Sequence, residues 1–192
     1  MSDPSGRPRE ARVDEAVRDA VVALLATEGY AGTTIAAVAA RAGVGRGALY
    51  RRWRSKAELV FANVIHPVEL AEPEDRGTLG GDIEALSLRI AELTGSAAAR
   101  AAIRGLATDP ELGGALDERV FEAERRHLER ILTRASIRGE LGPGVDPDLV
   151  RRLLVGPIAL APLFSPTDGD PREIARVVTA GLLATHTPRE SP

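Results

Sequence analysis

The stretch from residue 33 to residue 56, TTIAAVAARAGVGRGALYRRWRSK, constrains the fold more than any other part of this chain. Its first half predicts a short helix, because apolar residues recur there at helical spacing and two threonines precede them as potential caps. Gly43 follows at the position where glycine most easily ends a helix. A second short helix is expected from about residue 45 to residue 52. Two short helices joined by a glycine-containing turn form a helix-turn-helix.

The charge of this stretch favours binding to a polyanion. Five cations and no acid lie between Val44 and Lys56, and Tyr50 and Trp53 alternate with them. Cations neutralise phosphates, and the planar guanidinium of arginine can bind a phosphate or a guanine edge through two hydrogen bonds. Residues 1–56 carry ten basic and six acidic side chains, whereas the remainder carries fifteen and twenty-two. Taken alone, this asymmetry fits a chance distribution as well as a polyanion-binding end.

Five short segments share their order, spacing and residue types with a known signature: Thr33-Thr34-Ile35, Val38-Ala39, Gly43-Val44, Gly47-Ala48-Leu49-Tyr50 and Ser55-Lys56-Ala57-Glu58-Leu59. They resemble the N-terminal signature of the tetracycline-repressor (TetR/AcrR) family of transcriptional regulators, over about residues 10–66. The resemblance implies an all-α protein of about nine helices. It implies a three-helix helix-turn-helix domain at 10–66 and a ligand-binding and dimerisation domain at 67–187. Residues 1–9 are expected to form a disordered N-terminal tail and residues 188–192 a C-terminal tail.

The resemblance further implies a homodimeric repressor that binds a palindromic DNA operator and is released by a small-molecule effector. The implied DNA contacts are Thr33, Thr34, Arg46, Gly47, Ala48, Tyr50, Arg51, Arg52 and Lys56. The threonines are expected to face phosphate at a helix N-terminus, and Arg46 is the leading candidate for a guanine edge. Gly47 would allow close approach, and Ala48 would touch a thymine methyl. The remaining four are expected on phosphates, with a base edge as the alternative for Arg51. Gly45 stands where many family members have serine or threonine, so the second helix is expected to lack a side-chain cap.

The remainder of the chain predicts helices almost to its end. A first helix is expected at about 10–28, ended by Gly29, and later ones at about 81–93, 96–107, 110–138, 148–164 and 171–185. The resemblance implies that the last two pair with their copies in a second subunit, through Leu154, Ile158, Phe164, Ile174, Val177, Val178, Gly181 and Leu182. A two-fold DNA site also requires two reader helices about 34–36 Å apart. Packing of both helices inside one chain is the alternative.

Other function classes find little support. The absence of cysteine excludes disulfides and thiolate metal sites, and His66, His127 and His186 have no metal-ligand spacing, so no metal or cofactor is expected. No nucleophile motif or phosphate-binding loop indicates an enzyme. No apolar run is long enough to span a bilayer and no signal peptide is apparent, which predicts a cytoplasmic protein. A helical interaction or small-molecule-binding protein without a DNA role is the alternative. The candidate effector contacts are Phe61, Leu86, Phe121 and Leu160.

Overall fold

The computed structural model describes residues 6–65, 74–110, 118–142, 144–161 and 169–185. Within these ranges the chain is all-α, with nine α-helices and two five-residue π-helical segments, which confirms the predicted fold class. The chain divides into two compact units. One comprises residues 1–68 and 96–117, and the other comprises 69–95 and 118–192. The helix at 97–106 therefore groups with the N-terminal unit, an association that the sequence pattern did not predict.

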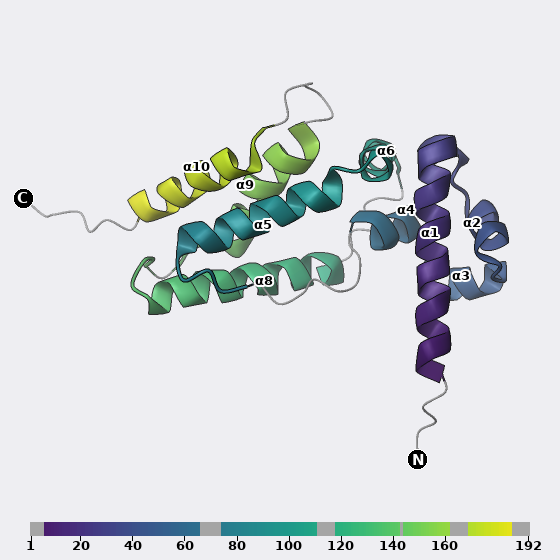
Figure 1. Ribbon diagram of the computed structural model, residues 1–192, viewed down its shortest axis with the longest axis horizontal. Helices are drawn as coiled ribbons and strands as arrows, with labels where there is room; N and C mark the ends of the chain where they lie inside the picture. Colours follow the sequence, from purple (N-terminus) through teal and green to yellow (C-terminus); the bar gives the residue numbers. More distant parts are fainter. Residues whose placement is uncertain (1–5, 66–73, 111–117, 143, 162–168, 186–192) are drawn as a thin grey trace, which may run out of the picture. The chain divides into compact units, whose positions relative to one another are not determined.

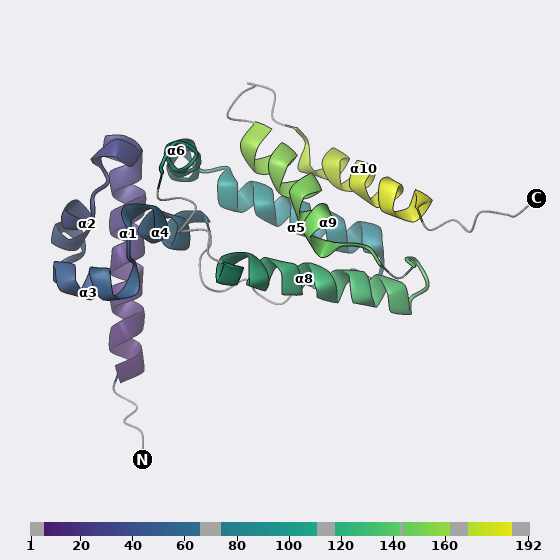
Figure 2. The same cartoon turned by 180° about the vertical axis from the view of Figure 1, so that it is seen from behind.

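The first unit contains α1 (Gly6–Gly32), α2 (Ile35–Ala42), α3 (Arg46–Arg52), α4 (Lys56–Val60) with its π-helical extension η1 (Phe61–Ile65), and α6 (Ala97–Leu106). Figures 1 and 2 show α2 and α3 together along one flank of α1. The α1 helix begins at Gly6, so the second half of the expected disordered tail is helical. Gly29, where this helix was expected to end, breaks its regular geometry because its φ of 66° is left-handed, but α1 continues beyond this kink to Gly32.

The core of this unit holds α2 and α3 in place. Val17 and Val21 of α1, Val38 of α2 and Leu59 of α4 are fully buried, and Leu49 of α3 is 2% exposed. Isolated helices of seven or eight residues are not stable in water, so α2 and α3 depend on this packing. Each of them buries one apolar face, and that burial fixes how the helix is rotated about its axis. The side chains on the opposite face of α3 are therefore presented to solvent in a fixed orientation.

Tyr30 is the point where three helices of the first unit meet. Its hydroxyl donates to the Asp109 carboxylate at 2.5 Å, just beyond α6. The Lys56 ammonium, from the first turn of α4, lies 3.9 Å from the centroid of the Tyr30 ring. Gly105 of α6 packs so closely on the same ring that a Cβ atom there would lie 2.0 Å from Tyr30 Cγ. The tyrosine therefore joins the end of α1 to both α4 and α6.

The second unit contains α5 (Leu79–Thr94), α8 (Glu118–Ile137), α9 (Pro147–Val155) with its π-helical extension η2 (Gly156–Leu160), and α10 (Pro171–Ala184). In both views α5 runs between α8 and α10, and α9 crosses one side of this layer (Figures 1 and 2). Ile83, Ile131, Val150 and Leu154 form the centre of its core. Pro157 has no N–H for a regular helix, and the chain continues there with wider π-helical turns.

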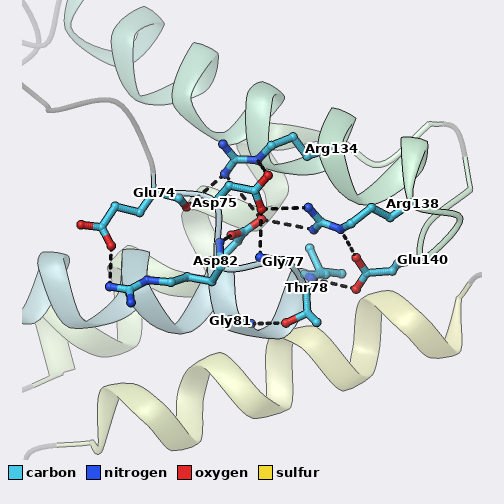
Figure 3. A network of polar contacts seen from close by, with 11 residues as sticks. Glu74, Asp75, Gly77, Thr78, Gly81, Asp82, Arg134, Arg138 and Glu140 are labelled. Carbon is cyan, nitrogen blue, oxygen red and sulfur yellow. Dashed lines mark hydrogen bonds and ion pairs between the residues drawn. The ribbon is translucent and has the colours of Figure 1, made fainter.

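A network of arginines and carboxylates joins the start of α5 to the end of α8 (Figure 3). The Asp82 carboxylate is fully buried, lies 3.2 Å from Arg138 Nη2 and accepts a hydrogen bond from the backbone N–H of Arg76. Glu140 accepts from Arg138 Nε at 2.5 Å and from the backbone N–H of Leu79 at 2.7 Å. Burial alone would raise the pKa of Glu140, but these two donors overcome it and hold the pKa below its usual 4.5.

Candidate DNA-binding surface

Local capping fixes the turn between α2 and α3. The Thr34 hydroxyl accepts a hydrogen bond from the Ala37 N–H at 3.1 Å, which satisfies one free donor in the first turn of α2. Gly43 ends α2 in the left-handed conformation, with φ of 67°, and the Val44 N–H donates back to the Ala39 carbonyl at 3.0 Å. The predicted helix-turn-helix is therefore present, with its turn at the expected glycine.

The α3 helix presents a basic face. Leu49 points into the core, whereas Arg46, Gly47, Tyr50 and Arg51 are exposed, Tyr50 by 56%. These four positions lie three and four residues apart, so they share one side of the helix. The N-cap residue of α3 is Gly45, so the helix has no side-chain cap, as expected. An exposed tyrosine ring gains little from contact with water alone. The tyrosine hydroxyl and the neighbouring arginines can instead donate hydrogen bonds to DNA phosphates.

Gly47 is not required by the fold. Its backbone is helical, and a Cβ atom placed on it would meet only the tip of Arg51, at 3.9 Å. Glycine in a helix interior is destabilising by about 1 kcal/mol relative to alanine. Gly47 therefore lowers the stability of α3 without avoiding any close contact within the chain. The missing side chain leaves room for another molecule to come close to the α3 backbone.

Two of the expected phosphate contacts are engaged within the chain. Arg52 forms an ion pair with Asp14 of α1 through both of its terminal nitrogens. Lys56 is half-buried, stacks on Tyr30 and donates to the Tyr30 carbonyl at 3.4 Å. Both cations therefore help to fix α3 and α4 on α1. Either would have to exchange these partners to reach a phosphate, so their assignment to DNA stays a prediction.

Thr33 is a correction to the expected set. Its side chain is fully buried, and its hydroxyl donates to the Gly29 carbonyl at 2.8 Å. Its backbone N–H is also used, by the Gly29 and Tyr30 carbonyls. Thr33 therefore closes the end of α1 and has no donor available for a phosphate. The exposed Thr34 keeps the position expected for both threonines.

Two side chains also cap the start of α4. The Ser55 hydroxyl accepts from the Glu58 N–H at 3.1 Å, as in a capping box. Glu58 Oε2 accepts from the backbone N–H of Arg54, at 2.5 Å, rather than from that of Ser55. The acidic side chain thereby stabilises the short segment between α3 and α4.

The candidate effector contacts are dispersed. Leu86 of α5 lines two neighbouring cavities of about 270 and 60 Å³ in the second unit. Phe61 is buried in the first unit, Leu160 is 43% exposed on η2, and the Phe121 side chain lies outside the described residues. Arg89, which was not among the expected contacts, also lines both cavities. An arginine within the apolar spacing of Leu86, Ile90 and Leu93 was the available signal.

The expected dimer contacts fall into two groups. Leu154, Ile158 and Leu182 are buried in the core of the second unit, so these side chains have almost no surface left for a partner. Ile174 and Val178 are partly buried against the same core, and Phe164 lies outside the described residues. Val177 is 64% exposed and Gly181 is exposed. Three further leucines on α9 and α10, outside the expected set, are exposed: Leu149, Leu153 and Leu183.

Other kinds of site find no support in the part of the chain that the structure describes. There, no group of three or more histidine, aspartate or glutamate side chains is arranged to hold a metal ion. None of the described helices combines the length and the apolar character that crossing a bilayer requires.

Family models match both parts of the chain. Residues 17–62 match the model of bacterial regulatory proteins of the tetR family, which covers α2, α3 and α4. Residues 73–180 match the model of the tetracyclin repressor-like C-terminal domain, which is more than half of the chain. The first match falls on the helices that present the basic face.

Individual relatives agree with these models. An uncharacterized HTH-type transcriptional regulator of Mycobacterium tuberculosis, Rv1556, is 34% identical over 136 residues, which are 69% of this chain and 67% of the relative. The HTH-type transcriptional regulator AqdR of Rhodococcus erythropolis is 30% identical over 81% of this chain and 79% of its own. The crystal structure of TylP, a TetR regulator from Streptomyces fradiae, superimposes with a TM-score of 0.62 at 27% identity, over 94% of this chain and 89% of TylP.

Regulators of the TetR family bind DNA operators and act as dimers, and they are not enzymes. The helix-turn-helix, its basic face and the matches along both units agree with that description. The chain belongs to the TetR family of DNA-binding transcriptional regulators.

Proposed function

We propose that this protein is a homodimeric repressor that holds a palindromic operator through α3 and releases it when a small molecule binds the second unit. The observation that carries the proposal is the exposed face of Arg46, Gly47, Tyr50 and Arg51 on a helix fixed by its buried Leu49. A helix of this size fits the major groove, and its first turn contacts base edges. Because its operator would be chromosomal, we place its action in the cytoplasm.

The proposed contacts have different tasks. Arg46 lies at the start of α3 and would read a guanine edge, while Tyr50 and Arg51, one turn on, would contact phosphates and fix the register. Ala48 is partly buried, so only the exposed part of its methyl group would touch a thymine methyl. Thr34, at the N-terminus of α2, would approach a phosphate on the neighbouring turn of backbone.

The proposed dimer would use the exposed apolar side chains of α9 and α10. Leu149 and Leu153 are spaced four residues apart on α9, and each is nearly half exposed. Val177 is 64% exposed and Leu183 is 41% exposed on α10. Exposed large apolar side chains on these two helices are the surface that we assign to the partner subunit. Leu154, Ile158 and Leu182 would support this surface from beneath rather than touch the partner.

Replacing Arg46 by alanine is expected to weaken operator binding by about 1–3 kcal/mol and to relax discrimination at one base pair. The reason is that a bidentate contact to a guanine edge distinguishes that base, whereas phosphate contacts do not. The measurement is fluorescence anisotropy with the upstream DNA and a set of single-base variants. Arg18→Ala, which removes an exposed arginine of α1, is the matched control and should retain the preference. Equal loss of affinity for every base variant would remove Arg46 from the reading residues.

Replacing Gly47 by alanine is expected to stabilise the fold and yet weaken DNA binding. The substitution gains up to about 1 kcal/mol of helix stability and meets no close neighbour within the chain. The added methyl group would instead occupy the space through which DNA approaches. Thermal unfolding and operator titration on the same preparation separate the two effects. A variant that is more stable and binds DNA as tightly as the native protein would show that DNA does not come close at Gly47.

A further inference from the structure

Arg89 of α5 has no partner among the residues that the structure describes. Its Nε atom is buried without a hydrogen bond, and its guanidinium forms no ion pair with any described residue. A guanidinium carries five N–H donors and stays charged at all physiological pH values. A buried N–H donor without an acceptor is unfavourable in a protein that binds nothing there.

Arg89 also stands at the junction of two cavities. The cavities of about 270 and 60 Å³ share Leu86, Arg89 and His127 in their linings. The smaller one has basic groups from three helices, namely Arg89 of α5, His127 of α8 and Arg151 of α9, and its described lining contains no carboxylate. Arg151 pairs outside this lining with Asp148 at 3.4 Å, whereas Arg89 has no such pair among the described residues. The rest of that lining is aliphatic, with Leu93, Leu128 and Val155 among its members. The lining thus combines an imidazole and a guanidinium that no described carboxylate pairs with apolar walls on the other sides.

The acidic groups near the larger cavity are mostly committed elsewhere. Asp82 is held by Arg138 and by the backbone of Arg76, and Glu74 pairs with the Arg76 side chain at 2.6 Å. Glu92, one turn from Arg89, is exposed to solvent and forms no ion pair with it. The positive charge of Arg89 is therefore not neutralised by any carboxylate that the structure describes in this unit.

We propose that the effector is an organic anion with an aliphatic body, whose carboxylate or phosphate is held by Arg89. This inference rests on the proposed effector-controlled DNA binding and names the chemical class of the effector. The planar guanidinium can hold either anion through two parallel hydrogen bonds. The apolar tail would lie among the aliphatic side chains that α5, α8 and α9 contribute to the smaller cavity. The described lining of that cavity contains no phenylalanine, tyrosine or tryptophan. Together the cavities reach the lower end of the range of about 300–1,000 Å³ typical of ligand sites, which favours a small tail.

The test is isothermal titration of the full chain with octanoate and octyl phosphate, and with octan-1-ol and octylamine as uncharged and cationic probes of the same length. At least one of the two anions should bind about tenfold or more tightly than the alcohol, and the comparison between them tells whether the head group is a carboxylate or a phosphate. Arg89→Gln should weaken anion binding about ten- to hundredfold, because it removes a charge-assisted hydrogen bond. Arg89→Lys keeps the charge but loses the planar pair of N–H donors, so its affinity for the anion should lie between those of the native chain and Arg89→Gln. Arg125→Gln, on the exposed side of α8, is the matched control and should bind like the native chain.

The results separate this inference from the proposed function. Equal binding of alcohol and anions, equal binding by Arg89→Gln, or no binding of either anion by protein that does bind its operator would overturn the anion site alone. If octanoate or octyl phosphate binds through Arg89 while no upstream DNA fragment binds, the repressor proposal fails and the site stands. If the anion binds and lowers operator affinity in the native chain but not in Arg89→Gln, both are supported.

Discussion

Replacing Asp82 by asparagine is expected to lower the free energy of unfolding by about 3 kcal/mol, more than any other single change considered. Its carboxylate is fully buried between Arg138 at 3.2 Å and Arg134 at 3.5 Å, so the amide would leave two guanidinium groups without their shared counter-ion (Figure 3). Each arginine is about one quarter exposed, and water would reduce the penalty to the lower end of the range for broken buried ion pairs. Urea unfolding of the native and variant proteins measures the difference.

The matched control is Glu84→Gln on the same helix. Glu84 pairs with Arg172 at 3.1 Å, but the side chains are 47% and 63% exposed, so this pair should contribute less than about 1 kcal/mol. A loss for Asp82→Asn no larger than that for Glu84→Gln would mean that the network does not join α5 to α8. It would also mean that burial of Asp82 is not what makes this ion pair strong.

Acid should weaken the same network through Glu140. Its pKa is lowered in the folded chain, so its contribution to stability is complete above the unfolded value and is lost as the pH falls through the folded one. Glu140→Gln removes the titrating group, and its unfolding midpoint should therefore fall less steeply than that of the native protein between about pH 5 and pH 3. Parallel pH profiles for the two proteins would contradict this account of the Asp82–Arg138–Glu140 network.

Replacing Gly105 by alanine is expected to disrupt the first unit. The new Cβ would lie 2.0 Å from Cγ and 2.3 Å from Cβ of Tyr30, atoms close to the backbone that cannot move without moving α1. Such overpacking costs about 1–3 kcal/mol, against a gain of up to about 1 kcal/mol from better helix propensity. Because displacement of Tyr30 also removes its bond to Asp109 and its contact with Lys56, operator affinity should fall as well.

Gly80→Ala provides the comparison for Gly105→Ala. Gly80 lies inside α5, where an added Cβ would meet only the Thr179 methyl at an ordinary 3.7 Å. This variant should be as stable as the native protein or slightly more stable, and it should bind the operator normally. Thermal unfolding of both alanine variants tests the difference. If Gly105→Ala unfolds at the native temperature, the packing of α6 on Tyr30 does not stabilise this unit.

Local patterns in the sequence predicted the local structure well. The apolar spacing, Thr34 and Gly43 specify α2 and its two ends by interactions within eight or so residues, and the structure has them where the sequence placed them. Leu49 and the exposed arginines of α3 follow from the same helical spacing. In the second unit, Leu79–Thr94 and Pro171–Ala184 lie near their predicted bounds. The helix expected at 110–138 is described only over Glu118–Ile137, and the one expected at 148–164 is α-helical over Pro147–Val155 and π-helical over Gly156–Leu160.

Contacts between residues distant in the chain could not be predicted in the same way. Nothing near Thr33 shows that its hydroxyl closes α1 instead of facing outward, and the pairing of Arg52 with Asp14 joins positions 38 residues apart. The grouping of α6 with the first unit depends on Tyr30, Gly105 and Asp109, which also lie far apart in sequence. Leu154 and Val177 were both apolar candidates for the dimer contact. The packing of the helices buries Leu154 in the core and leaves Val177 exposed, and the sequence alone does not distinguish them.

The most direct test of the central claim is the spacing of the two half-operators that one dimer binds. After footprinting has located the operator upstream of the gene, about five base pairs, or half a helical turn, are inserted between its half-sites. If a homodimer presents two copies of α3, two chains should bind the native duplex. The insertion should then reduce the affinity to that for unrelated DNA, because the two half-sites no longer face the same side of the duplex. Undiminished binding to the lengthened operator, or binding of a single chain, would contradict the account.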